Sequence, residues 1–253
     1  MGTMKFTVLG SNAGAPSPSN PGSGYLVQTS STSIWMDAGP GTFAALSQIM
    51  DPRDIDGMVL SHTHIDHCVD ALGMFAYLEY GLGGGRTMDV YAPQGTTSHL
   101  AAFVRADADH VFHRRMKVRE VGSGDTGGIG DVELAFGDAV HPVPAMVTRM
   151  TGEGSSMVYS GDTGPGGDLI EMATGVDLLL VEAALQGVRD QSTYPFHLTA
   201  REGGEIASMA GVNQLVLTHI NFTKDVQLSI DQASSAFVGP IEYAAPQSVF
   251  EME

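Results

Sequence analysis

Four side chains of metal-ligand type lie within six residues, in the motif HTHIDH that directly follows the apolar run 57–60. The apolar run predicts a buried strand. In extended backbone His62 and His64 point to the same side, and a turn into a following helix can aim Asp66 and His67 at a neighbouring point. Imidazole pairs suit zinc, and the carboxylate suits a harder neighbouring ion. The motif therefore predicts a site for two metals, and the buried strand before it argues against the alternative, a solvated histidine-rich turn.

Three further candidate ligands lie downstream, at or just beyond the ends of predicted strands: His141, Asp162 and His219. Each of them alone would be typical of a turn or a cap, where Asp is favoured and His is accepted. Together they complete two metal spheres in which Asp162 is shared. The strand before His219 is also similar to the strand before His62, because both end in a hydroxyl residue followed by a histidine. Ligands at the carboxyl ends of buried strands are the usual arrangement of sites in α/β proteins.

Short β-type runs and amphipathic helical patterns must position these residues. Strands are expected at 5–9, 25–29, 33–36, 57–60, 89–92, 117–121, 132–136, 156–159, 178–181 and 214–217. Helices are expected at 42–50, 70–80, 97–106, 168–173, 199–210 and 229–237. The early strands come in hairpin-like clusters and the later ones alternate with helices, which predicts two mixed sheets covered by helices on their outer faces. The glycine-rich loops between them lack the Lys-Ser/Thr that a nucleotide-binding P-loop requires.

The chain of 253 residues is 43% apolar and contains a single cysteine, Cys68. This length suits one large domain, 1–253, with one core. One cysteine cannot form an internal disulfide, and no apolar run is long enough to span a bilayer. The N-terminal run 4–9 predicts a strand and not a signal peptide. We therefore expect a soluble cytoplasmic protein without membrane contact, in which Cys68 is a small buried residue.

The charge balance is strongly acidic, with 12 Lys and Arg against 29 Asp and Glu and a formal net charge of −17. Such a surface repels a phosphate backbone, so a long nucleic acid is not an expected partner. The densest group of cations, in the segment 114–119, is interpreted as a basic strand edge that discourages aggregation. A small anionic substrate is still compatible with the charge, because a bound metal reverses the field locally.

The order of the candidate ligands, His-x-His-x-Asp-His and then His, Asp and His, resembles the metallo-β-lactamase fold family over nearly the whole chain. Asp37, just after the predicted strand 33–36, matches the first motif of that family, in which the aspartate braces the metal loop. A bridging Asp162 and the absence of a cysteine ligand distinguish the chain from the zinc β-lactamases. Three segments are instead similar to the ribonuclease Z and phosphodiesterase branch: 160–165, 181–183 and 196–199. The His-Glu-Ala-Thr element of that branch is present only in part, since Val181 and Ala184 replace its first and last residues.

The resemblance implies a four-layer αββα sandwich of two mixed β-sheets flanked by helices, with a dinuclear zinc site at one edge of the sheets. Manganese or iron are the alternatives to zinc. One metal would take three ligands: His62, His64 and His141. The second metal would take Asp66, His67 and His219, and Asp162 would bridge the two.

The resemblance also implies three catalytic residues: Asp66, Glu182 and His197. His197 would stand opposite the metals as a general acid or phosphate-binding group, and Glu182 would orient it. This pairing is chemically sound, because the departing alkoxide needs a proton and a carboxylate behind an imidazole fixes its tautomer and stabilises its cation. The alternative for His197 is an ordinary residue at a helix start, with Thr199 as the N-cap.

The expected function is hydrolysis of a phosphodiester bond in a small substrate by a metal-bridging hydroxide, with a cyclic nucleotide as the best single expectation. Three alternatives stay open: ribonuclease Z-like RNA processing, hydrolysis of an ester, lactone or thioester, and metal binding without catalysis. The tRNA-processing members of the family carry a long arm between the third histidine ligand and the bridging aspartate. Here 20 residues separate His141 from Asp162, enough for two strands and a turn. The resemblance also implies a homodimer. For His110 and His113 a solvated loop is favoured over a substrate lip.

Overall fold

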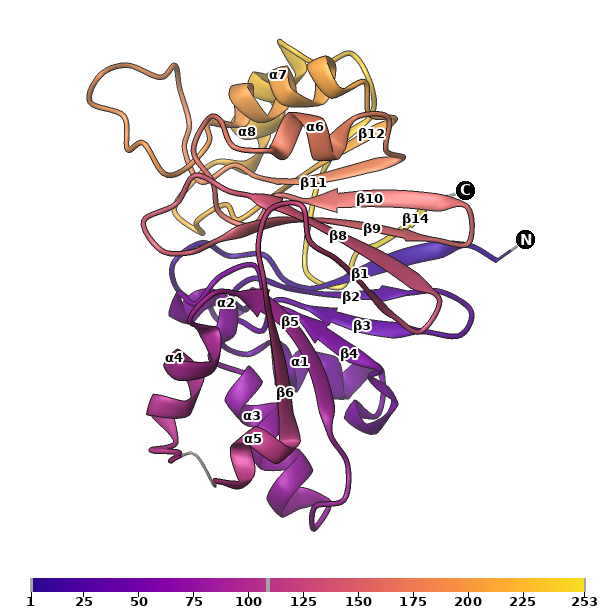
Figure 1. The fold of residues 1–253 in the computed structure, drawn as a ribbon. Helices are drawn as coiled ribbons and strands as arrows, with labels where there is room; N and C mark the ends of the chain where they lie inside the picture. The colour runs from indigo at the N-terminus through magenta and orange to yellow at the C-terminus, as the bar shows by residue number, and fades with distance from the viewer. Residues whose placement is uncertain (1, 108–109, 253) are drawn as a thin grey trace.

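Two seven-stranded β-sheets packed face to face form the centre of the computed structural model, which describes residues 2–107 and 110–252 (Figure 1). The first sheet has the strand order β14-β1-β2-β3-β4-β5-β6 and the second has the order β13-β12-β11-β10-β9-β8-β7. The strands of the first sheet are β1 (Met4–Gly10), β2 (Gly24–Gln28), β3 (Ser33–Met36), β4 (Gly57–Val59), β5 (Met88–Pro93), β6 (Met116–Val121) and β14 (Val249–Met252). Those of the second are β7 (Thr126–Ile129), β8 (Val132–Asp138), β9 (Met146–Gly152), β10 (Ser155–Tyr159), β11 (Leu178–Glu182), β12 (Gln214–Thr218) and β13 (Ile241–Tyr243).

Both sheets follow the same plan, with antiparallel strands first and parallel strands after them. In the first sheet β1, β2 and β3 are antiparallel neighbours and β3 to β6 are parallel. In the second sheet β7 to β10 are antiparallel and β10 to β13 are parallel. β3 and β10 therefore hold the same position, and an aspartate follows each of them. The similar strands before His62 and His219 do not correspond in this way, because β4 is next to β3 whereas β12 is two strands from β10.

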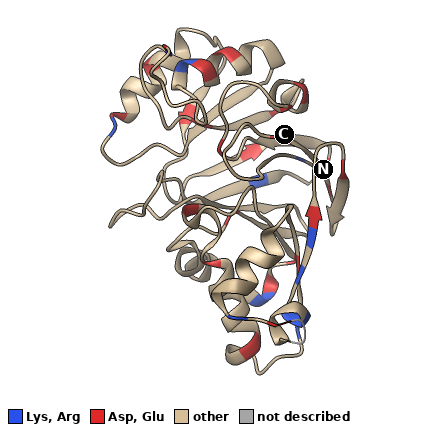
Figure 2. Ribbon diagram, turned by 60° about the vertical axis from the view of Figure 1, so that its left-hand side comes forward, with Lys and Arg blue, Asp and Glu red and all other residues tan. Residues whose placement is uncertain are grey.

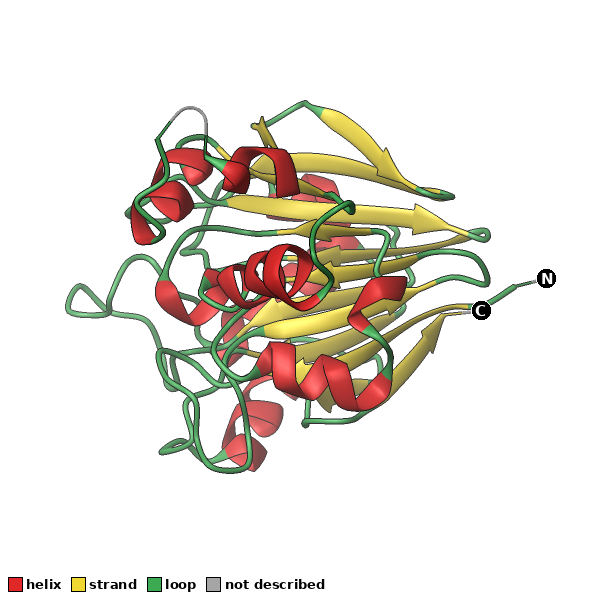
Figure 3. Ribbon diagram, turned by 90° about the horizontal axis from the view of Figure 1, so that it is seen from below, coloured by secondary structure: helices red, strands yellow, loops and turns green. Residues whose placement is uncertain are grey.

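Helices cover the outer face of each sheet, which completes four layers and confirms the predicted αββα sandwich of two mixed sheets (Figure 1). Figure 3 shows helices lying across the outer face of the strands when the molecule is seen from below. In the first half of the chain these are α1 (Thr42–Ile49), the single turn η1 (Pro52–Asp54), α2 (Ile65–Cys68), α3 (Ala71–Ala76), the π-helical turn η2 (Tyr77–Gly81), α4 (Thr96–Phe103) and α5 (Val111–Arg115). In the second half they are α6 (Leu169–Ala173), α7 (Ala200–Ala210) and α8 (Val226–Ser234). No helix in the described part of the chain has the length and apolar character that crossing a membrane requires.

Apolar side chains fill the space between the sheets and the space under each helical layer. The inner cluster contains residues of both sheets, among them Phe6, Met36, Phe136 and Leu180. A second cluster joins the first sheet to α1, α3, α4 and α5, and a third joins the second sheet to α6, α7 and α8. Because burial of apolar area is the main favourable term in folding, these three clusters stabilise the sandwich.

Four strands were not predicted: β7, β9, β13 and β14. β7 lies in a segment that was expected to be a glycine-rich loop, and its residues pair with β8 through the backbone. The glycine at 127 has a packing reason, because a Cβ at Gly127 would lie 2.5 Å from the ring of Tyr91. The prediction for α8 was also wrong by three residues at its start, since Asp225 caps the helix by accepting hydrogen bonds from Gln227 N and Leu228 N.

The segment around His110 and His113 is a short helix and not the solvated loop that was favoured. His110 is the N-cap of α5 and accepts a hydrogen bond from Phe112 N at 3.1 Å, and His113 lies within α5. Of the neighbouring cations, Lys117 and Arg119 lie on β6, the last strand of the first sheet, whereas Arg114 and Arg115 belong to α5. That these charges discourage aggregation stays a prediction. Arg115 pairs with Glu79 at 2.6 Å, and Figure 2 shows Lys and Arg interspersed with Asp and Glu along the ribbon.

Replacing Leu180, which is fully buried between the sheets, is expected to destabilise the fold strongly. Leu180→Ala leaves a cavity, so the free energy of unfolding should fall by about 2–5 kcal/mol. Urea unfolding followed by circular dichroism measures the change. Leu228→Ala is the matched control, because Leu228 is 42% exposed on α8, and it should cost about 0.5 kcal/mol or less. Equal losses for the two variants would contradict this core.

Candidate metal centre and active site

The structure gathers the four-residue motif and the three downstream candidates in loops that follow strands of both sheets. The motif residues come from the loop after β4 and from α2. The downstream residues follow β8, β10 and β12. Most of these side chains are buried, and His64 and His141 are half-buried. Residues that are far apart in the sequence thus meet at one edge of the two sheets, in the loops that follow these strands.

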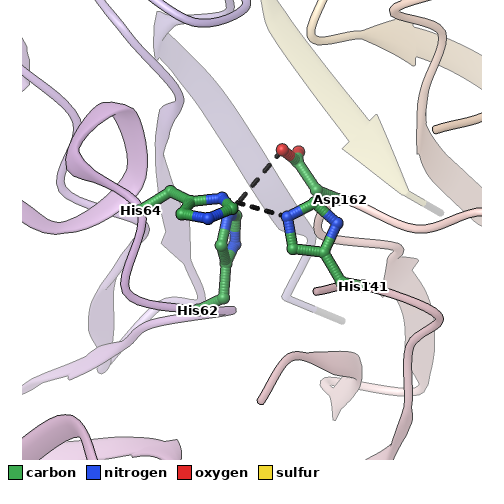
Figure 4. Close-up of side chains that lie close together, drawn as sticks. All are labelled: His62, His64, His141 and Asp162. Carbon is green, nitrogen blue, oxygen red and sulfur yellow. Dashed lines mark hydrogen bonds and ion pairs between the residues drawn. The ribbon is translucent and has the colours of Figure 1, made fainter. Parts of the chain in front are cut away.

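The first group contains His62, His64, His141 and Asp162, whose ligand atoms all lie within 4.8 Å of one another (Figure 4). His64 Nδ1 is 3.1 Å from His62 Nε2 and 3.0 Å from His141 Nε2. A carboxylate oxygen of Asp162 is 3.7 Å from His62 Nε2. Three ring nitrogens and a carboxylate that converge in this way match the donor set that zinc prefers.

The second group contains Asp66, His67 and His219, again with ligand atoms within 4.8 Å of one another. Asp162 connects it to the first group, because its Oδ1 is 3.2 Å from His67 Nε2 and its Oδ2 is 3.2 Å from His219 Nε2. His219 adopts a left-handed backbone with φ of 53°. Asp162 therefore lies between the two groups, which is the position that the resemblance implied for it.

Hydrogen bonds on the far side of the rings leave the converging nitrogens available. His67 Nδ1 lies 2.7 Å from an oxygen of Asp37, and His219 Nδ1 lies 3.0 Å from the hydroxyl of Ser23. His67 Nε2 and Asp162 Oδ1 are buried without a hydrogen-bond partner among the described residues. Buried polar atoms are normally satisfied, so these two atoms, which lie 3.2 Å from each other, fit a pair of ligands to a divalent metal.

Burial also keeps most of the imidazoles neutral. It lowers the pKa of His141 and His219 to about 4 and the pKa of His62 well below its usual value. A neutral imidazole offers a lone pair, which a protonated one lacks. Burial alone would raise the pKa of Asp162, but the imidazoles of His219 and His67 hold it well below its usual range. The site therefore combines three neutral imidazoles with an ionised carboxylate, as metal binding requires. His67 differs, because burial would lower its pKa but Asp162 and Asp37 outweigh burial and raise that pKa well above the usual value.

Asp37 braces the motif, as the resemblance implied. Its buried carboxylate accepts hydrogen bonds from the backbone N–H and the hydroxyl of Ser61, both at 2.7 Å, and contacts His67 Nδ1. Tyr159 donates a fourth hydrogen bond at 2.8 Å from the opposite sheet. The role of Tyr159 was missed in the sequence, because nothing near it in the chain marks it as a partner of Asp37.

Two contacts from the loop between β1 and β2 were also missed. Gly14 N donates to Asp66 Oδ2 at 2.7 Å, and Ser23 contacts His219 as described above. The glycines and prolines of this loop predicted only an irregular connection, so no local signal could have revealed these contacts. Cys68 is buried, as expected, and burial raises the pKa of its thiol to about 12, so it does not offer a thiolate.

His197 and Glu182 form a pair beside the two groups. His197 Nδ1 lies 2.8 Å from Glu182 Oε1, and the His197 ring stacks on His219 with centroids 5.6 Å apart. Glu182 is fully buried at the end of β11 and also accepts hydrogen bonds from Thr163 N and Ala184 N. Burial would lower the pKa of His197, but the hydrogen bond that its Nδ1 donates to Glu182 raises it above its usual value. The alternative reading is only half right, since Thr199 does cap α7 while His197 faces Glu182.

Replacing Asp162 tests the shared position. Asp162→Ala should bind less metal than the wild type after dialysis against a weak chelator, because both groups lose a carboxylate oxygen. Elemental analysis of the dialysed proteins measures the metal bound per chain. Asp54→Ala, which removes an exposed carboxylate from η1, should retain the wild-type metal content. Two tightly bound metals in Asp162→Ala would contradict the shared role.

Comparison with known proteins agrees with this architecture. The family described as "Beta-lactamase superfamily domain" matches residues 32–220, a range that contains every candidate ligand. An uncharacterized protein of Mycobacterium tuberculosis is 31% identical over 262 aligned residues, which cover 99% of this chain and 93% of that protein. A ribonuclease Z of Methanopyrus kandleri is 28% identical, with 92% of each chain covered.

A solved structure is also similar over the whole chain. The metallo-beta-lactamase fold protein YhfI from Bacillus subtilis, named a probable metallo-hydrolase, superposes with a TM-score of 0.88 at 25% identity. The superposition covers 98% of this chain and 99% of YhfI. From the matched family, the full-length relatives and the shared fold, the chain belongs to the metallo-β-lactamase superfamily and has ribonuclease Z-like relatives.

Proposed function

We propose that this protein is a metal-dependent phosphodiesterase that hydrolyses small phosphodiesters, with cyclic nucleotides as its substrate class. The observation that carries the proposal is the His197–Glu182 pair, held at 2.8 Å beside two groups of metal-ligand side chains. A site that only binds metal would not need such a pair. Relatives named metallo-hydrolase and ribonuclease Z support hydrolysis, and ribonucleases cleave phosphodiester bonds.

The two groups of side chains would hold two divalent metals, with zinc proposed and manganese or iron as alternatives. The first would be held by His62, His64 and His141, the second by Asp66, His67 and His219, with Asp162 shared. When bound, such metals activate water at neutral pH and stabilise the negative charge that develops on the phosphoryl oxygens. The imidazoles that are neutral through burial suit this role.

His197 is proposed to supply the proton that the leaving group needs. Its Nδ1 is occupied by Glu182, so Nε2 is the atom that remains for the substrate. As the bond from phosphorus to the leaving oxygen breaks, the electron pair stays on that oxygen, which takes the proton from Nε2. Glu182 stabilises the imidazolium before the transfer and fixes the ring tautomer.

A small substrate is favoured by the chain between His141 and Asp162. That segment is occupied by β9, β10 and the turn that joins them, so it holds no arm for the body of a tRNA. The net charge of −17 also disfavours a long phosphate backbone. RNA processing is the second candidate, because a ribonuclease Z matches over 92% of its own length.

Replacing His197 tests proton delivery. His197→Ala should retain its metals and lose rate by a factor of about 10² to 10⁴, as is typical for a lost acid–base group. The loss should shrink for phosphodiesters with acidic leaving groups such as 4-nitrophenol, because these depart without a proton. Steady-state kinetics over a series of leaving groups measures this dependence. His99→Ala, which changes an exposed residue of α4, is the control, and an equal loss for every leaving group would show that His197 does not act as the acid.

Direct comparison of substrates tests the substrate class. The metal-loaded protein should hydrolyse a cyclic nucleotide with a kcat/KM well above that for cleavage of a tRNA precursor. Both reactions are measured on one preparation at physiological salt, since salt weakens nucleic-acid binding. Efficient trimming of the tRNA precursor without cyclic-nucleotide turnover would favour the RNA-processing candidate and contradict this proposal.

A further inference from the structure

An exposed aromatic side chain lies directly beside the proposed acid. Tyr194 belongs to the connection between β11 and α7, which Figure 1 shows as a loop that projects beyond the sheets. Its ring centroid is 5.6 Å from that of His197, with the ring planes inclined by 33°. The residue is 51% exposed, and its hydroxyl has no hydrogen-bond partner in the part of the chain that the structure describes. The ring also meets that of Phe196 edge to face, with centroids 5.6 Å apart. A half-exposed ring next to a reacting group is available for stacking with a ligand.

The short segment that carries Tyr194 is held through its backbone. Arg189 donates hydrogen bonds to the carbonyl oxygens of Tyr194, at 3.1 Å, and of His197. His141 Nδ1 contacts the carbonyl oxygen of Phe196 at 3.2 Å. These contacts fix both ends of the segment 194–197 relative to the metal-ligand groups.

The loop between β11 and α7 is also packed closely against the loop that follows β10. A Cβ at Gly164 would lie 1.8 Å from the carbonyl oxygen of Pro195, so only glycine permits this approach. Arg189 in turn forms an ion pair with Glu202, with one contact at 2.9 Å. Glu202 accepts a hydrogen bond from Thr199 N in the capping box of α7. The backbone of the segment is therefore anchored to α7, in the helical layer over the second sheet.

We propose that Tyr194 is one wall of a subsite for a flat aromatic group on the leaving side of the substrate, namely the base of a nucleotide. The inference rests on the proposed function, in which His197 acts at the leaving oxygen. The part of the substrate that carries that oxygen must lie next to His197, and the ring of Tyr194 lies next to His197. Every nucleobase has a flat π-face, so any of them can stack on an aromatic side chain. The subsite would therefore favour nucleotides over phosphodiesters without a base.

Binding of the reaction product tests this subsite without using turnover. Isothermal titration calorimetry on the metal-loaded protein compares adenosine 5′-monophosphate with ribose 5-phosphate, which lacks the base. Stacking on an aromatic side chain corresponds to roughly 5- to 150-fold in affinity. The wild type should therefore prefer the nucleotide, and Tyr194→Ala should lose about that factor for the nucleotide while ribose 5-phosphate binds as before. Tyr194→Phe should behave like the wild type, because it keeps the ring.

Tyr80→Ala is the matched control, because Tyr80 is 73% exposed in η2, and it should leave both affinities unchanged. Equal weakening of both ligands in Tyr194→Ala would show that Tyr194 only supports the loop and would overturn the subsite. No preference of the wild type for the nucleotide, or no weakening in Tyr194→Ala, would overturn it too. Failure of the proposed function is a different result, since it appears as absent phosphodiester hydrolysis by a wild type whose binding preference is still measurable.

Discussion

The buried carboxylate of Asp37 is the group on which the rest of the site depends. Removing a carboxylate from water costs several kcal/mol unless hydrogen bonds replace its hydration. Here Ser61, His67 and Tyr159 supply those bonds, and they come from both sheets. The same contacts that compensate for burying Asp37 therefore align the first sheet with the second and aim His67 into the site.

The other residues of the site are arranged around Asp37 in successive shells. The motif follows β4, the neighbour of β3. Asp162 follows β10, which holds the same position in the second sheet as β3 holds in the first. Glu182, at the end of the next strand along, reaches the His197 pair and also binds the backbone of Thr163. His197 itself comes from the loop between β11 and α7. Each shell uses backbone N–H and C=O groups as well as side chains. Because these groups satisfy the hydrogen bonds of the buried polar side chains, the site can contain many of them.

The sequence predicted those parts of the molecule that are encoded locally. The order and periodicity of strands and helices predicted the two-sheet sandwich, and the helical pattern at 199–210 predicted the start of α7 within one residue. The structure brings together all the residues that strand-end spacing had selected as ligands, although their binding of metal stays a prediction. β7 was missed because its glycines suit a loop, and its strand geometry comes from pairing with β8. The contacts of Tyr159 and Gly14 were missed because tertiary packing alone brings them to Asp37 and Asp66.

The left-handed backbone of His219 restricts which residues this position can accept in related chains. Glycine adopts this conformation freely, and aspartate and asparagine adopt it at modest cost, whereas β-branched residues clash. Glycine would remove the proposed metal ligand. A viable exchange therefore leads from imidazole to an oxygen donor, and oxygen donors prefer harder ions such as manganese or magnesium over zinc. The backbone conformation at this position thus favours substitutions that would change the metal preference over substitutions that would leave it unchanged.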